Sequence, residues 1–151
     1  MYLAPFSFSF FLWSFIFLLL SLISVSFCAT KLGTMLVRTF ASAVTGIDAV
    51  TVTVEVNVSQ GIRFFLVGLP DSAVKESQQR IESAFRSLGF HWPGKQVVIN
   101  MAPADIRKEG SSYDLPLAVG ILAADERVIK GDVESYIIMG ELSLDGTLQP
   151  V

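Results

Sequence analysis

The segment NMAPADIRKEGSSYDLP, residues 100–116, decides the fold because it joins an apolar strand to the start of a helix. Before it, the run QVVINM at 96–101 is short enough for a strand and apolar enough to be central in a sheet. After it, Asp114 is expected to cap a helix, with Pro116 in the first turn and Ala124 near the end. This strand–loop–helix order predicts an α–β layer.

Toward the N-terminus, the sequence predicts three strands in series. Residues 36–44 form the first, and Gly46 supplies a turn. In the second, five valines alternate with polar residues, so one valine face is expected to be buried: Val50, Val52, Val54, Val56 and Val58. A turn at Gln60-Gly61 leads to a third strand at 62–67.

A helix is predicted between this third strand and the strand at 96–101. Asp71 is a good N-cap, and Gly89 stands where a C-terminal cap is expected. The apolar positions between them fall on one helical face: Val74, Ile81, Ala84, Phe85 and Leu88.

Beyond the second helix, residues 137–142 read as a strand, and Asp145-Gly146 is a strong signal for a two-residue hairpin flanked by Leu144 and Thr147. The element order is then three strands, helix, strand, helix and two strands. This order predicts an α+β fold, a mixed sheet with two helices on one face.

Residues 1–34 differ from the rest of the chain and are set apart as an apolar leader, leaving 35–151 as the folded domain. The run 6–29 has no charged residue and is long enough to cross a bilayer as a helix. Three interpretations stay open: a membrane span, a signal sequence without its basic region, or a start site assigned upstream of Met35. The domain is expected in the cytoplasm, with anchoring through residues 6–29 as the alternative and the membrane as a partner only if the leader is real.

Composition excludes several kinds of site. One cysteine, Cys28, and one histidine, His91, allow neither an intrachain disulfide nor a Cys/His metal centre. Residues 62–108 carry seven basic and four acidic residues, while 109–151 carry two basic and eight acidic. The basic excess is far below that of a nucleic-acid-binding domain, which favours a solvated surface.

The segment GFHWPGKQ, residues 89–96, misses the nucleotide-binding P-loop pattern by one residue. Gln96 lacks the hydroxyl that a P-loop provides for Mg²⁺. A P-loop also joins a strand to a following helix, whereas here the helix comes first. The segment is therefore expected to be a connection between helix and strand.

Ser112 is the one candidate catalytic residue. The run Lys108-Glu109-Gly110-Ser111-Ser112 resembles the loop of Lon-type proteases, with Ser112 at the position of their catalytic serine. The resemblance implies that the lysine partner of this serine lies on an element after residue 151. It weakens at Tyr113 and Asp114, where Lon-type loops continue with small residues. The preferred interpretation is structural, with the two serines turning the chain and capping the next helix. The charged residues at 105 and 107–109 are expected to pair locally on a surface loop, with a docking surface as the alternative.

Three longer segments resemble one family: VGLPDSAVKES at 67–77, NMAPADIRKEGSSYDLPLAVGIL at 100–122, and GELSLDGTLQPV at 140–151. TGIDA at 45–49 fits as well. They are similar to the N-terminal domain of magnesium-chelatase-like AAA ATPases of the YifB/ComM type.

The resemblance implies a ribosomal-S5-domain-2-like fold, distantly like the Lon protease domain, and a non-catalytic accessory role ahead of an ATPase module. It implies that 35–151 is an incomplete domain, truncated before that module. ATP and Mg²⁺ would belong to the missing module, and no cofactor is expected in this chain. The implied partners are the module, sister subunits of a hexameric motor, and DNA through the full-length protein, as in branch migration. The alternatives are a Ser–Lys peptidase using Ser112 and a membrane-tethered binding domain.

Overall fold

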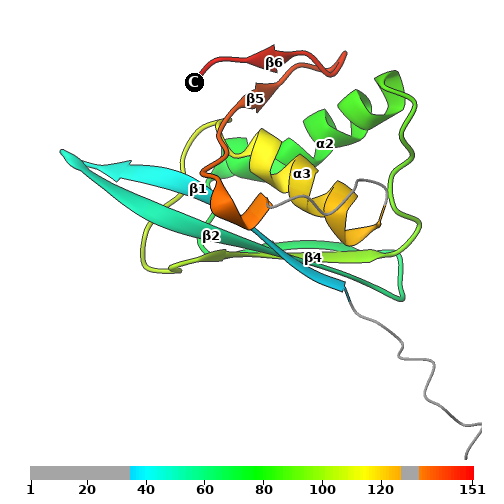
Figure 1. Ribbon diagram of the computed structural model, residues 1–151, viewed down its shortest axis with the longest axis horizontal. Coiled ribbons are helices and arrows are strands. Elements are labelled where there is room, and N and C mark those ends of the chain that lie inside the picture. Colours follow the sequence, from blue (N-terminus) through cyan, green and yellow to red (C-terminus); the bar gives the residue numbers. More distant parts are fainter. Residues whose placement is uncertain (1–34, 127–132) are drawn as a thin grey trace, which may run out of the picture. The chain divides into compact units, whose positions relative to one another are not determined.

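The computed structural model describes residues 35–126 and 133–151 (Figure 1). Their elements follow the predicted order of strands and helices, with one short 3₁₀ turn added. The bounds are β1 Met35–Thr45, β2 Asp48–Ser59, β3 Phe64–Val67, α2 Ser72–Ser87, β4 Gln96–Ala102, α3 Asp114–Ala124, η1 Val133–Ser135, β5 Glu141–Leu142 and β6 Leu148–Gln149.

The first four strands form one mixed sheet in the order β1-β2-β4-β3. β1 pairs with β2 and β2 with β4 in antiparallel register, whereas β3 runs parallel to β4. The strand at 96–101 is therefore central, as its apolar sequence predicts. In β2, Val52, Val54, Val56 and Val58 are buried and the intervening residues are not.

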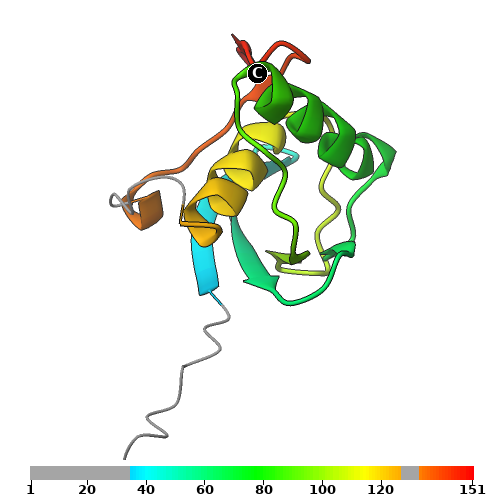
Figure 2. The ribbon, with the colours of Figure 1, turned by 90° about the vertical axis from the view of Figure 1, so that its right-hand side faces the viewer.

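Both helices lie on the same side of this sheet, with α3 against β1 and β2 and α2 beside α3 (Figures 1 and 2). Eight of the eleven residues of α3 are buried, since this helix is apolar on nearly every face. Gly120 allows the close approach to β2, because a Cβ there would overlap the side chain of Val56. The predicted α+β class, a mixed sheet with two helices on one face, is confirmed.

Helix α2 begins and ends as its sequence predicts. The Asp71 carboxylate accepts a hydrogen bond from the Val74 amide at 2.8 Å, which satisfies one free donor of the first turn. Gly89 follows the helix with φ of 79°, and the Phe90 amide donates to the Phe85 carbonyl at 2.8 Å. The rings of Phe85 and Phe90 are in edge contact, as is usual for this type of helix end.

Three local predictions are wrong. Helix α3 is preceded by Tyr113, whose side chain makes no capping bond, and Asp114 is the first helical residue, not the cap. The third strand covers only 64–67, because the chain bends at Gly61 and Ile62 and Ile62 is exposed, although the Arg63 carbonyl still accepts the Val97 amide of β4. Leu88 was expected on the buried face of α2 but is exposed, because the helix ends one residue before it.

The C-terminal hairpin is confirmed, but with different bounds. Residues 137–142 were expected to form one strand, yet only β5 pairs with β6, and Ile137 forms a separate parallel bridge with Phe40 of β1. The loop has three residues, because the Ser143 amide donates to the Thr147 carbonyl and Gly146 adopts φ of 89°. Ser143, not Leu144, therefore flanks the turn.

The apolar leader, residues 1–34, lies outside the described residues, so the three interpretations of it stay predictions. Within residues 35–126 and 133–151, neither helix is long and apolar enough to cross a membrane.

Candidate functional site

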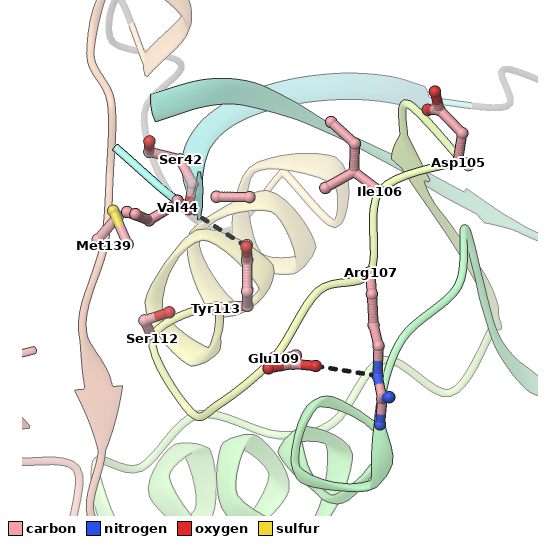
Figure 3. A pocket seen from close by; sticks show the side chains of 11 residues that line it. Ser42, Val44, Asp105, Ile106, Arg107, Glu109, Ser112, Tyr113 and Met139 are labelled. Atoms are coloured by element: carbon pink, nitrogen blue, oxygen red, sulfur yellow. Dashed lines mark hydrogen bonds and ion pairs between the residues drawn. The ribbon is translucent and has the colours of Figure 1, made fainter. Parts of the chain in front are cut away.

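The candidate site is a pocket of about 610 Å³ at one end of β1, a size typical of small-ligand sites. One wall is the β1 edge at Ser42 and Val44, together with Met139 from the segment before β5. The opposite wall is the loop between β4 and α3, with Ile106 and Arg107, and Ser112 and Tyr113 close the base (Figure 3). The loop that decides the fold therefore also builds the pocket.

Tyr113 connects the helix start to the sheet edge. Its hydroxyl donates a hydrogen bond to the Ser42 carbonyl at 3.2 Å (Figure 3). Burial of the ring raises the pKa of the Tyr113 phenol above its usual value of 10.0. The phenol therefore keeps its proton at neutral pH and acts as a donor, not as a base.

Ser112 lines the pocket, but only its main chain forms a hydrogen bond among the described residues. Its carbonyl accepts the Gly140 amide at 2.9 Å, which fastens the loop to the segment before β5. The neighbouring Ser111 hydroxyl donates to the Glu141 carboxylate at 2.5 Å. Among the described residues, no side chain is hydrogen-bonded to the Ser112 hydroxyl, so the paired base of a serine nucleophile is missing from this part of the chain. The two serines turn the chain before α3, since the Asp114 amide donates to the Ser111 carbonyl, but neither hydroxyl caps the helix.

Lys108, the basic residue of the protease-like run, directs its side chain away from Ser112 and toward main-chain carbonyls. It is fully buried, and its ammonium donates to the carbonyls of Gly68, at 2.9 Å, and Pro103. Burial lowers the pKa of Lys108 from its usual 10.5. Main-chain bonds to Leu69 and Asp71 hold the same residue against the turn before α2. Lys108 thus fastens two loops together and does not serve Ser112.

Local pairing on a surface loop was predicted for the charged residues at 105 and 107–109, and only Arg107 and Glu109 form such a pair, since Lys108 is buried against main-chain carbonyls. Arg107 and Glu109 form an ion pair at 3.2 Å in which both side chains are about two-thirds exposed. Asp105 lines the pocket rim. The basic excess of 62–108 is partly offset by acids further along the chain, since Lys95 pairs with Asp125 at 3.2 Å.

The P-loop-like segment at 89–96 is confirmed as a connection between α2 and β4. Its aromatic residue Trp92 packs against Phe64 and Phe85, with ring centroids 5.7 and 6.2 Å apart. These rings occupy the place where a phosphate cradle would need small residues.

Sequence reasoning missed a buried polar cluster around Asp114. Its carboxylate accepts hydrogen bonds from Ser77 at 2.5 Å and from the Arg80 guanidinium at 2.6 and 2.9 Å. It also accepts the Leu142 amide at 3.3 Å, so one side chain joins α2, α3 and β5. The sequence did contain a sign of this cluster, because Ser77 and Arg80 are polar residues three positions apart on one face of α2. Within residues 35–126 and 133–151, no group of three acidic, histidine or cysteine residues could hold a metal ion.

Comparison with known proteins places this architecture in a family. Residues 54–151 match the family described as subunit ChlI of Mg-chelatase. The chain is 44% identical over 110 residues to the uncharacterized protein YifB of Escherichia coli, a match that covers 72% of this chain and 22% of the relative. It is 42% identical over 113 residues to the competence protein ComM of Haemophilus influenzae, covering 74% of this chain and 22% of the relative. An uncharacterized protein of Mycobacterium tuberculosis is 38% identical over 115 residues, 76% of this chain and 23% of the relative.

The family match covers the second half of β2, both helices and the hairpin, and it contains the three segments on which the sequence resemblance rests. The chain spans about a fifth of the length of the relatives that it matches. The chain belongs to the ChlI family of magnesium-chelatase-like proteins, together with its YifB and ComM relatives.

Proposed function

We propose that residues 35–151 are a non-catalytic accessory domain of a magnesium-chelatase-like AAA ATPase that acts on DNA. In this proposal ATP and Mg²⁺ are bound by a separate module of the full-length protein, and sister subunits and DNA are its partners. Such a role places the chain in the compartment that holds DNA, the cytoplasm.

The observation that carries the proposal is the family match over residues 54–151, together with the name of one relative, a competence protein. Competence concerns the uptake of DNA, which supports a DNA-related role for this chain. The match covers 22% of each of two much longer relatives, which supports an accessory part in a larger machine.

The geometry of the loop supports a structural role for Lys108, the basic residue of the protease-like run. Its ammonium donates to two main-chain carbonyls, those of Gly68 and Pro103. The peptidase alternative requires a different lysine beside the Ser112 hydroxyl, on an element after residue 151. The role of Ser112 in this proposal is to line a pocket and to receive the Gly140 amide on its carbonyl.

The test uses the protein encoded by the complete gene, with hydrolysis of ATP measured with and without branched DNA. We expect hydrolysis that rises with DNA, and we expect Ser112→Ala to leave it within about twofold, because the serine hydroxyl holds no contact to lose. Ser111→Ala is the matched control, since it removes the bond to Glu141 from the neighbouring residue. Absence of ATP hydrolysis would refute the proposed ATPase role of the full-length protein. Cleavage of casein that is lost in Ser112→Ala would support the peptidase alternative instead.

A further inference from the structure

The C-terminal hairpin of β5 and β6 lies beside α2 and is attached to that helix through its turn (Figures 1 and 2). The hydroxyls of Ser83 and Ser87 donate hydrogen bonds to the Leu144 carbonyl at 3.2 and 3.0 Å. Gly146 lies against the Leu88 side chain, since a Cβ at Gly146 would come within 2.7 Å of it. The turn therefore has a fixed place on the C-terminal half of the helix.

The hairpin has an apolar face that the described residues cover only in part. Leu142 of β5 is buried, and Leu148 of β6 stands directly opposite it in the register of the two strands. Because directly opposite residues of an antiparallel pair project to the same face, Leu148 continues the face that Leu142 buries. Leu148 is nevertheless more than half exposed. The cover that the described residues provide for this face therefore ends between β5 and β6.

Leu148 belongs to a larger exposed apolar surface. Leu88 at the end of α2 and Leu144 in the turn are also more than half exposed. We call these three residues the leucine surface. The acid of the turn, Asp145, directs its carboxylate to the amide and hydroxyl of Thr147 and so is held within the turn itself. Adjoining apolar side chains that are exposed together mark a site of contact with another segment or molecule.

The length of the relatives indicates what covers the leucine surface. The matched part is 22% of YifB and of ComM, so about four-fifths of each polypeptide lies outside it. The family match includes α2 and the hairpin, so the surface belongs to the part that the family shares. A segment attached to the same polypeptide acts at an effective concentration of about 1 mM, which a separate protein rarely reaches. A segment of the same polypeptide is therefore favoured over a second copy or an unrelated protein.

We propose that the leucine surface of Leu88, Leu144 and Leu148 is the docking site of an apolar segment of the full-length protein that lies outside these 151 residues. The segment packs on the three leucines and completes the layer that β5 and β6 begin, since a two-stranded hairpin is only marginally stable by itself. The proposal rests on the proposed function only in placing this domain inside a longer protein, and it requires no ATP hydrolysis.

Hydrogen–deuterium exchange of the peptide covering residues 143–149, followed by mass spectrometry, compares the 151-residue chain with the protein encoded by the complete gene. We expect exchange at least about tenfold slower in the complete protein, because burial of the exposed leucines opposes local opening of the hairpin. Leu144→Asp places a charge on the surface and should return the exchange in the complete protein to within about twofold of that in the 151-residue chain. Ile62→Asp is the matched control, because Ile62 is also an exposed apolar residue but lies before β3, and the tenfold difference should remain.

Leu148→Asp tests the same surface from β6, and it decides the matter if Leu144→Asp alters the circular dichroism of the 151-residue chain. Equal exchange in the two unsubstituted proteins, or slow exchange that persists in both leucine variants, would overturn the proposal. A dimer of the 151-residue chain that is detected by sedimentation and dissociated by Leu144→Asp would assign the surface to a second copy and overturn it as well. Slow exchange in a complete protein that hydrolyses no ATP would uphold the docking site and refute the proposed function alone.

Discussion

The Asp114 carboxylate is the interaction whose loss should cost this domain most. It is fully buried and accepts hydrogen bonds from Ser77, Arg80 and the Leu142 amide. The Arg80 guanidinium that it holds is itself 20% exposed and raised in pKa by this hydrogen bond. The ion pair therefore links the two helices and the C-terminal hairpin in one place.

Asp114→Ala removes the carboxylate and leaves the guanidinium of Arg80 largely buried. Breaking a buried pair from one side typically costs about 3–5 kcal/mol. Arg80 is not fully enclosed and lies 3.9 Å from the exposed Glu76, which can partly replace the lost partner. We therefore expect a loss in the free energy of unfolding near the lower limit, about 3 kcal/mol. Asp114→Asn keeps an acceptor oxygen and should lose about 1 kcal/mol less.

Urea unfolding of the full chain, followed by circular dichroism at 222 nm, measures these differences in the free energy of unfolding. Glu82→Ala is the matched control, because it breaks the ion pair with Arg86 on the exposed face of the same helix and should cost less than about 0.5 kcal/mol. A loss below about 1 kcal/mol in Asp114→Ala, with unchanged urea dependence, would refute the claim that this cluster holds the two helices and the C-terminal hairpin together.

Three further changes test other parts of the fold by the same unfolding measurement. Gly68→Ala should cost more than about 2 kcal/mol, since φ is 102° there and a Cβ would overlap the β4 main chain; a stable variant would contradict this close approach. Asp71→Ala should cost about 1 kcal/mol through the lost N-cap of α2, and no loss would place the helix start elsewhere. Hydrogen bonds from Asn100 and Arg38 lower the pKa of Glu55 below 4.5, so its contribution is present above pH 4.5 and is lost as the pH falls below that value. Glu55→Gln should therefore flatten the acid side of the stability curve, and an unchanged slope would count against these bonds.

The sequence predicted the elements whose residues follow a simple period. The alternating valines of β2 face the core because every second residue of a strand points to one side. The face of α2 at Val74, Ile81 and Phe85 is buried for the corresponding reason in a helix. Both patterns are local, so they can be read without knowing what lies opposite.

Predictions failed where a distant partner decides the outcome. Asp114 looks like a helix cap from its neighbours, but Ser77 and Arg80 draw its carboxylate inward once α2 packs beside α3. Residues 137–142 look like one strand, yet Ile137 joins β1 while Glu141 pairs with β6. Asp114 lies 37 positions from Ser77 and 34 from Arg80, and Ile137 pairs with a residue of the first strand, so no local periodicity contains these contacts.

The protease-like run shows most clearly how spacing in a sequence can mislead about chemistry. Lys108 precedes Ser112 by only four residues, so the sequence alone places an ammonium and a hydroxyl in the same loop. In the fold, burial of Lys108 against the carbonyls of Gly68 and Pro103 sends its side chain toward the turn before α2. Ser112 lies at the pocket and is held by its main chain to Gly140. The same loop therefore holds Lys108 against the turn before α2 and places Ser112 and Tyr113 at the pocket beside β1.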